Sequence, residues 1–284
     1  MPPLALKIDV DTYRGMKLGI PELSGILERF NILGSFFISF GPDRSGLAVL
    51  QFFRPKFIKK MLRTNAPGLY GLKTVLYGTL LPAPMIGKNF PDQIRSLSGL
   101  GHEIACHAWD HRLWQDWLPL MRKKTIDAWF TSMVDAYEEI LGRVPEAFGA
   151  PGWVMDSRAL ERVKAHGFRY LSCTRADSPF LFRENSLVEI PSNLPCIEEV
   201  GVEGVLSQLR EQSNTHIPQV LPVHAEVEGG LYRKEFEIIL ETAISCGYEL
   251  VRIQDIAHSI DTASLPIREL RMGMIPGRAF PCAI

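Results

Sequence analysis

Short apolar runs typical of buried strands alternate along the chain with longer amphipathic segments typical of helices. This alternation predicts a parallel sheet covered by helices and closed into a barrel, with an open doubly wound sheet as the alternative. We expect strands at Leu4–Val10, Ser35–Ser39, His102–His107, Ala147–Ala150, Phe168–Ser172, Leu187–Ile190, Gln219–His224 and Glu249–Arg252. We expect helices at Ile20–Asn31, Leu118–Leu141, Val202–Gln212 and Leu231–Cys246, and one from Asp156 or Ser157 to His166.

The 284 residues suffice for one large domain or two modest ones, and they contain no internal repeat or low-complexity segment. We expect a single domain over residues 1–259 and an irregular C-terminal extension over residues 260–284. Five cysteines without a CxxC pair indicate reduced thiols in a reducing compartment. With no secretory signal and no run of roughly 18 apolar residues, we expect a cytoplasmic protein without a membrane-spanning helix.

Residues with catalytic potential gather at the C-terminal ends of the expected strands. Asp9 and Asp11 end the first strand, His107 ends another, and His224 ends a late one. Pro151–Trp153 follows a further strand. Active sites of parallel α/β barrels are built at this rim, so we expect these side chains to lie close together.

An aspartate pair and a histidine pair supply the ligands of a divalent metal. Asp9 and Asp11 stand two residues apart, which places both on one face of a strand. His107 and His111 stand four apart, so both rings can face one ion. One carboxylate with two imidazoles suits zinc, cobalt, iron or manganese and leaves positions for water and substrate. Each pair alone fits a simpler origin, namely backbone capping by aspartates and a chance histidine pair.

His224 and the tryptophans also allow two interpretations. A lone histidine at a strand end is more often a core or capping residue, but on a rim with two others His224 is the natural general acid. Trp109 and Trp153 can wall a sugar-sized pocket. Core packing is the expectation for at least two of four tryptophans, Trp109, Trp114, Trp117 and Trp153.

From Leu4 to His258 the chain resembles the polysaccharide deacetylases of the NodB-homology type, carbohydrate esterase family 4. The matching motifs are the early aspartate pair, His107-Ala-Trp-Asp-His111 and the late Leu221-Pro-Val-His224. The resemblance implies a distorted parallel (β/α) barrel, here with a basic amphipathic insertion.

The resemblance also implies a division of roles within the site. Asp11, His107 and His111 would hold a divalent metal (zinc, cobalt or manganese), Asp9 would be the base, and His224 would be the acid. Two carboxylates, Glu226 and Asp255, are the alternatives for orienting His224. A backbone N–H after His111 or near Thr12 would help to stabilise the oxyanion.

The chain departs from the family pattern in two places. Val10 separates aspartates that are usually consecutive in the family, and Gly149 occupies the position of an arginine that normally holds the base. We therefore hypothesise that Arg175, which follows the next strand, supplies the missing cation and is a third catalytic residue.

Four segments are similar to a deformylase branch of the family, which acts on an N-formylated amino sugar carried on a polyprenyl phosphate. The segments are Val10–Thr12, His107–His111, Ala150–Trp153 and His224–Gly229. The branch implies a metal-dependent hydrolase of a linear amide, and its product serves lipid A modification and polymyxin resistance. We expect substrate contacts from Thr12, Trp109, Pro151, Gly152 and Trp153. The alternatives are an N-deacetylase of another amino sugar or polysaccharide, and a membrane-surface binding protein without catalysis.

The segment 44–90 concentrates positive charge in an apolar, aromatic-rich block. It contains eight lysines and arginines and no acidic residue, whereas the rest of the chain carries 23 basic against 32 acidic residues. Its stretch Pro55–Arg63 is amphipathic, a pattern that suits the plane of an anionic membrane surface. The expected membrane-binding residues are Lys56, Phe57, Lys59, Lys60, Met61 and Arg63.

The composition of this insertion also suits a basic lid over an anionic substrate, a partner-binding helix, or a solvated helix packed on the barrel. We do not expect a nucleic-acid partner, because no known nucleic-acid-binding module accompanies the charge. A polyprenyl-phosphate substrate stays in the bilayer, so we expect a peripheral protein at the cytoplasmic face of the bacterial inner membrane.

Overall fold

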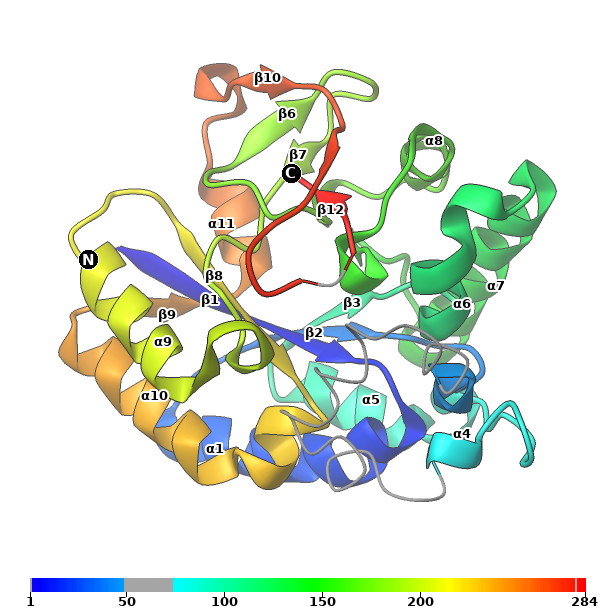
Figure 1. Ribbon diagram of the computed structural model, residues 1–284, viewed down its shortest axis with the longest axis horizontal. Helices are drawn as coiled ribbons and strands as arrows, with labels where there is room; N and C mark the ends of the chain where they lie inside the picture. The colour runs from blue at the N-terminus through cyan, green and yellow to red at the C-terminus, as the bar shows by residue number, and fades with distance from the viewer. Residues whose placement is uncertain (1, 49–73, 279) are drawn as a thin grey trace.

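The structure is a computed structural model that describes residues 2–48, 74–278 and 280–284 (Figure 1). The strands of the main sheet lie in the order β10-β6-β7-β5-β4-β3-β2-β1-β8, and β9 pairs with the start of β1. Their bounds are β1 Pro3–Val10, β2 Ser35–Ile38, β3 Glu103–Cys106, β4 Ala147–Gly149, β5 Tyr170–Ser172, β6 Phe180–Phe182, β7 Val188–Glu189, β8 Gln219–His224, β9 Glu249–Val251 and β10 Ile267–Arg268.

The sheet curls into a half-barrel. Every pairing from β5 through β4, β3 and β2 to β1 and β8 is parallel, and β6 pairs antiparallel with β7. In the described part of the chain, β8 and β10 end the hydrogen-bonded order, so strand pairing does not close the ring. The distorted parallel barrel expected from the family resemblance is thus confirmed, whereas a barrel closed by strand pairing is not what forms.

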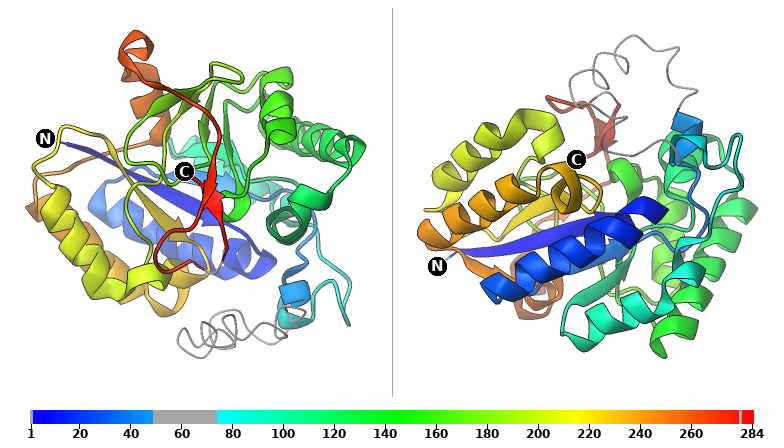
Figure 2. Two further views of the ribbon diagram at one scale, coloured as in Figure 1. Left: turned by 45° about the horizontal axis from the view of Figure 1, so that its top comes forward. Right: turned by 90° about the horizontal axis from the view of Figure 1, so that it is seen from below.

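Most helices pack on the outer face of this sheet, whereas the helix Ile253–Ser259 packs Ile253 and Ile256 against its inner face. The bounds of the helices are α1 Ile20–Phe30, α4 Ile86–Asn89, α5 Pro91–Gly99, α6 His111–Trp117, α7 Lys123–Leu141, α8 Ser157–Ala165, α9 Ile197–Gln212, α10 Arg233–Ser245 and α11 Ile253–Ser259. Figure 2 shows α1 and α10 next to each other outside β1. In the described residues, no helix is long and apolar enough to span a bilayer.

Several helices differ from the expectation. The helix expected from Leu118 begins at Lys123, because Leu118–Leu120 forms a separate 3-10 turn. It ends at Leu141, and Gly142 follows with φ +67°, a left-handed cap that suits glycine. The helix expected from Val202 begins earlier, at Ile197, and Gly201 interrupts its geometry with φ +74°. The helix α6, which starts at His111, was not predicted from the sequence, and neither were α4, α5 and α11.

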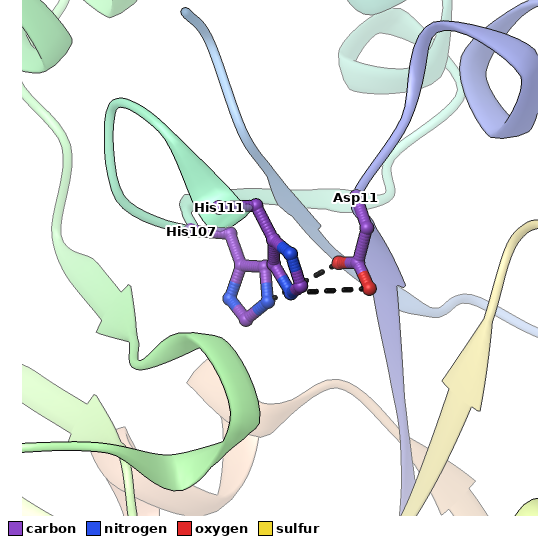
Figure 3. Close-up of side chains that lie close together, drawn as sticks. All are labelled: Asp11, His107 and His111. Atoms are coloured by element: carbon purple, nitrogen blue, oxygen red, sulfur yellow. Dashed lines mark ion pairs between the residues drawn. The ribbon is translucent and has the colours of Figure 1, made fainter. Parts of the chain in front are cut away.

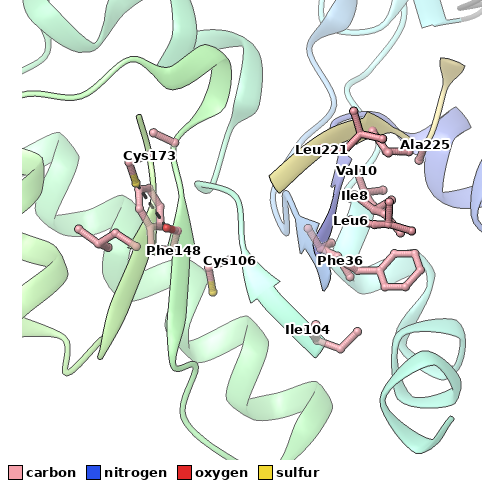
Figure 4. Close-up of a cluster of buried hydrophobic side chains, with 14 of the residues drawn as sticks. Leu6, Ile8, Val10, Phe36, Ile104, Cys106, Phe148, Cys173, Leu221 and Ala225 are labelled. Atoms are coloured by element: carbon pink, nitrogen blue, oxygen red, sulfur yellow. Dashed lines mark hydrogen bonds between the residues drawn. The ribbon is translucent and has the colours of Figure 1, made fainter. Parts of the chain in front are cut away.

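β1 separates two apolar cores by simple alternation of its side chains. Leu6, Ile8 and Val10 point outward and pack beneath the helices in the larger core (Figure 4). Ala5 points inward and belongs to a smaller core with residues of the neighbouring strands. Lys7 and Asp9 share this inward face, so the alternation that buries the outer core also carries two charged side chains into the half-barrel.

The C-terminal extension is more ordered than expected. β10 pairs with β6, and β11 (Met272–Gly273) forms an antiparallel pair with β12 (Cys282–Ala283). β12 lies against η5, the turn Pro151–Trp153, near the middle of the view in Figure 1. The residues predicted to bind the membrane, Lys56, Phe57, Lys59, Lys60, Met61 and Arg63, lie outside the described residues.

Candidate metal and catalytic site

Two turns bring the predicted metal ligands to one end of the sheet. Asp11 follows β1 directly, and His107 follows β3 directly. Ala108 then adopts φ +60°, a left-handed turn, and Asp110 caps α6 by accepting the Leu113 backbone N–H at 2.9 Å. His111 is consequently the first residue of α6, and its ring centroid lies 5.3 Å from that of His107.

Asp11, His107 and His111 converge on one point (Figure 3). The His107 Nε2–Asp11 Oδ1 distance is 3.3 Å, and the His111 Nε2–Asp11 Oδ2 distance is 3.2 Å. One ligand atom from each residue lies within 4.8 Å of the other two. The structure therefore brings together all three residues that were predicted to hold the metal.

The protonation of these groups fits a bound cation. His107 Nδ1 lies 3.0 Å from the Gly149 carbonyl oxygen, to which it can only donate, so Nε2 is the ring nitrogen left to bind a metal. Burial lowers the pKa of His111 to about 4, so this imidazole is neutral at pH 7. Burial opposes ionisation of Asp11, but His111 and His107 outweigh it and lower its pKa. Acceptor atoms that face one another in this way suit a divalent metal.

Asp9, the predicted base, lies beside the ligands and is held from behind. Its Oδ2 is 3.8 Å from His107 Nε2, and its side chain is almost fully buried. Lys7 Nζ donates to both carboxylate oxygens, at 2.5 Å and 2.6 Å. Sequence reasoning missed Lys7, although its signal was present: Lys7 and Asp9 stand two apart on one strand and therefore share a face.

The prediction that Arg175 holds Asp9 is wrong. Arg175 pairs instead with buried Glu199 at 2.7 Å and donates through Nε to the Ser192 carbonyl at 2.8 Å. Its guanidinium lies 4.7 Å from the centroid of the Trp153 ring. The guanidinium of Arg175 is therefore fully engaged by Glu199 and by backbone carbonyls. Lys7, not Arg175, pairs with the base Asp9.

His224, the predicted acid, has a carboxylate partner that the sequence did not reveal. Its Nδ1 lies 3.0 Å from Oε1 of Glu198, in the first turn of α9. Although burial works against the charged ring, Glu198 raises the pKa of His224 well above its ordinary value, so the imidazole retains its proton. Acidic residues are common in a first helical turn, so no sequence signal singled out Glu198.

Neither carboxylate proposed to orient His224 does so. Glu226 accepts the Thr12 backbone N–H at 2.8 Å and the Thr12 hydroxyl at 2.6 Å. Asp255 pairs with Arg252 at 2.7 Å, at the start of α11. Glu228 touches His224, but it accepts the backbone N–H at 2.8 Å rather than a ring proton.

In this structure Thr12 connects the segment after β1 to Glu226 by hydrogen bonds. Its N–H and hydroxyl both donate to Glu226, and the hydroxyl also accepts the Gly15 backbone N–H at 2.9 Å. A Cβ at Gly15 would lie 2.0 Å from a Glu226 carboxylate oxygen, so a side chain here would displace Glu226 from Thr12. We had expected a backbone N–H near Thr12 to stabilise an oxyanion. The N–H of Thr12 itself is not available for this, because it donates to Glu226.

Cys196 lies close to the acid pair. One ligand atom from each of Cys196, Glu198 and His224 falls within 4.8 Å of the others, so this group also has the spacing of metal ligands. Burial, together with Glu198 and Glu199, raises the pKa of the Cys196 thiol well above its usual value. The neutral thiol is therefore the favoured form of Cys196 beside the Glu198–His224 pair.

The predicted substrate wall has a buried and a half-buried part. Trp153 is 2% exposed and adopts φ +56°, while Trp109 is partly buried, with its carbonyl 2.9 Å from the Gly41 N–H. Trp114 is a core residue and donates to the Val154 carbonyl at 2.8 Å, whereas Trp117 is 49% exposed. Substrate contacts by Thr12, Trp109, Pro151, Gly152 and Trp153 remain predictions.

The described start of the basic insertion is anchored next to the histidine loop. Arg44 forms an ion pair with Asp110, the fully buried cap of α6. Asp43 accepts the Tyr13 backbone N–H at 2.8 Å. The insertion thus leaves the half-barrel beside both metal-binding segments.

Comparisons with known proteins identify related sequences. A family model described as polysaccharide deacetylase matches residues 57–171. A relative from Shewanella sediminis, named "probable 4-deoxy-4-formamido-L-arabinose-phosphoundecaprenol deformylase", is 34% identical over 97% of this chain and 92% of its own length. A relative of the same name from Wigglesworthia glossinidia brevipalpis is 32% identical over 93% and 96%.

The fold also has solved counterparts. A probable polysaccharide deacetylase from Pseudomonas aeruginosa superimposes with a TM-score of 0.63 at 15% identity, covering 90% of each chain. At that identity the likeness concerns the fold alone.

Proposed function

The chain belongs to the polysaccharide deacetylase family, whose relatives mark it as a hydrolase of amide C–N bonds, and on that premise we propose a specific substrate. We infer that it removes the N-formyl group of 4-deoxy-4-formamido-L-arabinose-phosphoundecaprenol and releases formate and the free amino sugar lipid. Two relatives named for that reaction, each similar over nearly its whole length, support this substrate. In this proposal the product serves lipid A modification and polymyxin resistance.

One observation carries the proposed mechanism: a metal-ligand cluster flanked by a candidate base and a candidate acid. Asp11, His107 and His111 have the geometry to hold zinc, cobalt or manganese. A metal bound there would polarise the formyl oxygen and make a water molecule more acidic. Asp9 lies within 4 Å of this cluster, and the protonated His224 faces it from β8.

The protein's own groups then account for both proton transfers. Asp9 accepts a proton from the water whose oxygen attacks the formyl carbon. His224 Nε2 donates a proton to the sugar nitrogen as the C–N bond breaks, which allows the amine to leave. Glu198 stabilises the imidazolium before transfer and orients the ring through Nδ1. The products are formate and the amine, with one water consumed.

A direct comparison of two substrates tests this proposal. Purified protein loaded with Zn²⁺, Co²⁺ or Mn²⁺ would be incubated with N-formylated and N-acetylated forms of the same amino-sugar lipid. We expect the rate of formate release to exceed that of acetate release with each of the three metals. Dominant acetate release would replace the deformylase with the alternative N-deacetylase, and release of neither would contradict both.

We also propose that the basic insertion binds an anionic membrane, so that the enzyme works peripherally at the cytoplasmic face of the inner membrane. The acid-free composition of residues 44–90 supports this, because each basic group near anionic lipid contributes about 1 kcal/mol. Replacing Lys56, Lys59, Lys60 and Arg63 with glutamine should reduce co-sedimentation with phosphatidylglycerol vesicles. Full sedimentation of that variant would show that the insertion is not the anchor.

A further inference from the structure

Lys7 occupies an unusual place for a lysine. In the described residues it is the only lysine or arginine whose side chain is fully buried. Its ammonium lies 4.7 Å from the centroid of the Phe37 ring and 5.7 Å from that of the Trp153 ring, and it donates to both oxygens of Asp9. Two aromatic faces and a carboxylate thus replace its hydration shell, a costly arrangement for a charge that only served stability.

From this geometry we propose that Lys7 is the positioning residue for the base of the proposed deformylase reaction. It fixes the Asp9 carboxylate through both oxygens at once, so the side chain cannot rotate. It also offsets the repulsion between Asp9 and Asp11, which stand two residues apart beside one metal site. Asp9 is thereby held with Oδ2 toward the ligand cluster, where water must be deprotonated.

Gly149 makes room for this lysine. A Cβ at Gly149 would lie 3.2 Å from Lys7 Cε and 2.5 Å from Cδ1 of Phe37. Any side chain at position 149 would therefore displace the groups that enclose the ammonium. Lys7 reaches Asp9 from the same strand, two residues earlier. The absence of a side chain at Gly149, on β4, leaves the space that Lys7 fills.

A second layer keeps Lys7 enclosed. The Trp153 ring that covers it is itself contacted by the guanidinium of Arg278, 4.5 Å from the ring centroid, and by that of Arg175 at 4.7 Å. Arg278 also donates to the Gly152 carbonyl at 3.1 Å. Arg175 therefore acts on the cover of the site, and Lys7 acts on the base.

Replacement of Lys7 by methionine, Lys7→Met, removes the charge while retaining an unbranched side chain among the two rings. We expect kcat to fall by about 100-fold, because Asp9 loses its fixed orientation, while KM and metal content stay within about twofold of wild type. Lys7→Arg should recover part of kcat, since it restores a cation. Lys124→Met, on the exposed face of α7, is the matched control and should behave as wild type.

A double-mutant cycle separates positioning from general support of the fold. If Lys7 acts through Asp9, Lys7→Met in an Asp9→Asn background should cost no more than about twofold beyond Asp9→Asn alone. Should Lys7→Met fail to fold, Lys7→Gln takes its place in the cycle.

Three results would overturn the inference: wild-type kcat in the uncharged variant, metal loss that parallels the activity loss, or multiplicative effects in the cycle. An inactive wild-type protein would instead contradict the proposed function, so the two failures are distinguishable.

Discussion

The base and the acid of the candidate site are built in opposite ways. Asp9 is held by Lys7, its neighbour on the same face of one strand, two residues away. His224, at the end of β8, is held by Glu198 from the first turn of α9, 26 positions earlier in the chain. One group is an anion fixed by a buried cation, and the other is a cation fixed by a carboxylate.

This contrast indicates which catalytic residues can be substituted with only partial loss of activity. Strand geometry alone brings Lys7 and Asp9 together, so that pair is set as soon as β1 takes its place in the sheet. The Glu198–His224 pair depends on how α9 packs across the end of the half-barrel. We call Lys7 and Asp9 the base half of the site, and Glu198 and His224 the acid half. We expect replacements in the acid half to reduce activity in part. Replacement of a metal ligand, on which both halves depend, should abolish activity.

Replacing His107 with alanine should break both halves at once and have the largest effect. His107 is a metal ligand in the proposed site, and its Nε2 also lies within 4 Å of Asp9 and Asp11. We expect loss of stoichiometric metal and of all measurable formate release. The protein should still fold, as far-ultraviolet circular dichroism can verify. Metal analysis of the variant at wild-type stoichiometry would refute the ligand assignment.

Replacing Glu198 with glutamine should weaken the acid half alone. Glu198 raises the pKa of His224, and the reaction requires the protonated ring, so activity is present below that pKa and lost as pH rises through it. Without the carboxylate the pKa falls, and the alkaline limb of kcat/KM should move to lower pH. The loss at neutral pH should be smaller than the about 100- to 10,000-fold expected from removing the imidazole itself.

Glu203→Gln, on the exposed side of the same helix, is the control for this variant. Metal content should be unchanged in both. An alkaline limb that stays in place in Glu198→Gln would mean that another group sets the protonation of His224.

Strand–helix alternation was sufficient to predict the parallel sheet, and residue type together with the family resemblance predicted the three residues that converge in the candidate metal site. Asp11, His107 and His111 each follow or open an element at the same end of parallel strands, which is a local property of the chain. The partners of the catalytic groups were harder to identify. Lys7 was within reach of the same reasoning, since any residue two positions before Asp9 on a strand shares its face.

Arg175 and Glu198 depend on contacts that the sequence does not reveal. Arg175 was chosen because a cation was needed and it followed a strand, but the orientation of a long side chain depends on acceptors contributed by distant segments. Here those acceptors are Glu199 and the carbonyls of Ser192 and Leu194. Glu198 reaches His224 because of the angle at which α9 packs on the half-barrel. The hydrophobic periodicity of the sequence does not reveal that angle. The order of the C-terminal extension was likewise hidden, because its strands are only two residues long.

Replacing Arg278 with methionine should have the smallest effect and should reach the base Asp9 through Trp153 and Lys7. Arg278 contacts Trp153, the cover of Lys7, from the C-terminal extension, and its Nη1 lies 3.6 Å from Oε1 of buried Glu199 in α9. A cation–π contact contributes about 0.5–2 kcal/mol, so the melting temperature should fall by about 2–6 °C. The kcat should fall about two- to tenfold, with the alkaline limb of the acid half unmoved. Arg271→Met, at an exposed position of the same extension, should change neither quantity. If the alkaline limb shifted instead, the cover and the acid would be coupled, and the two halves would not be independent.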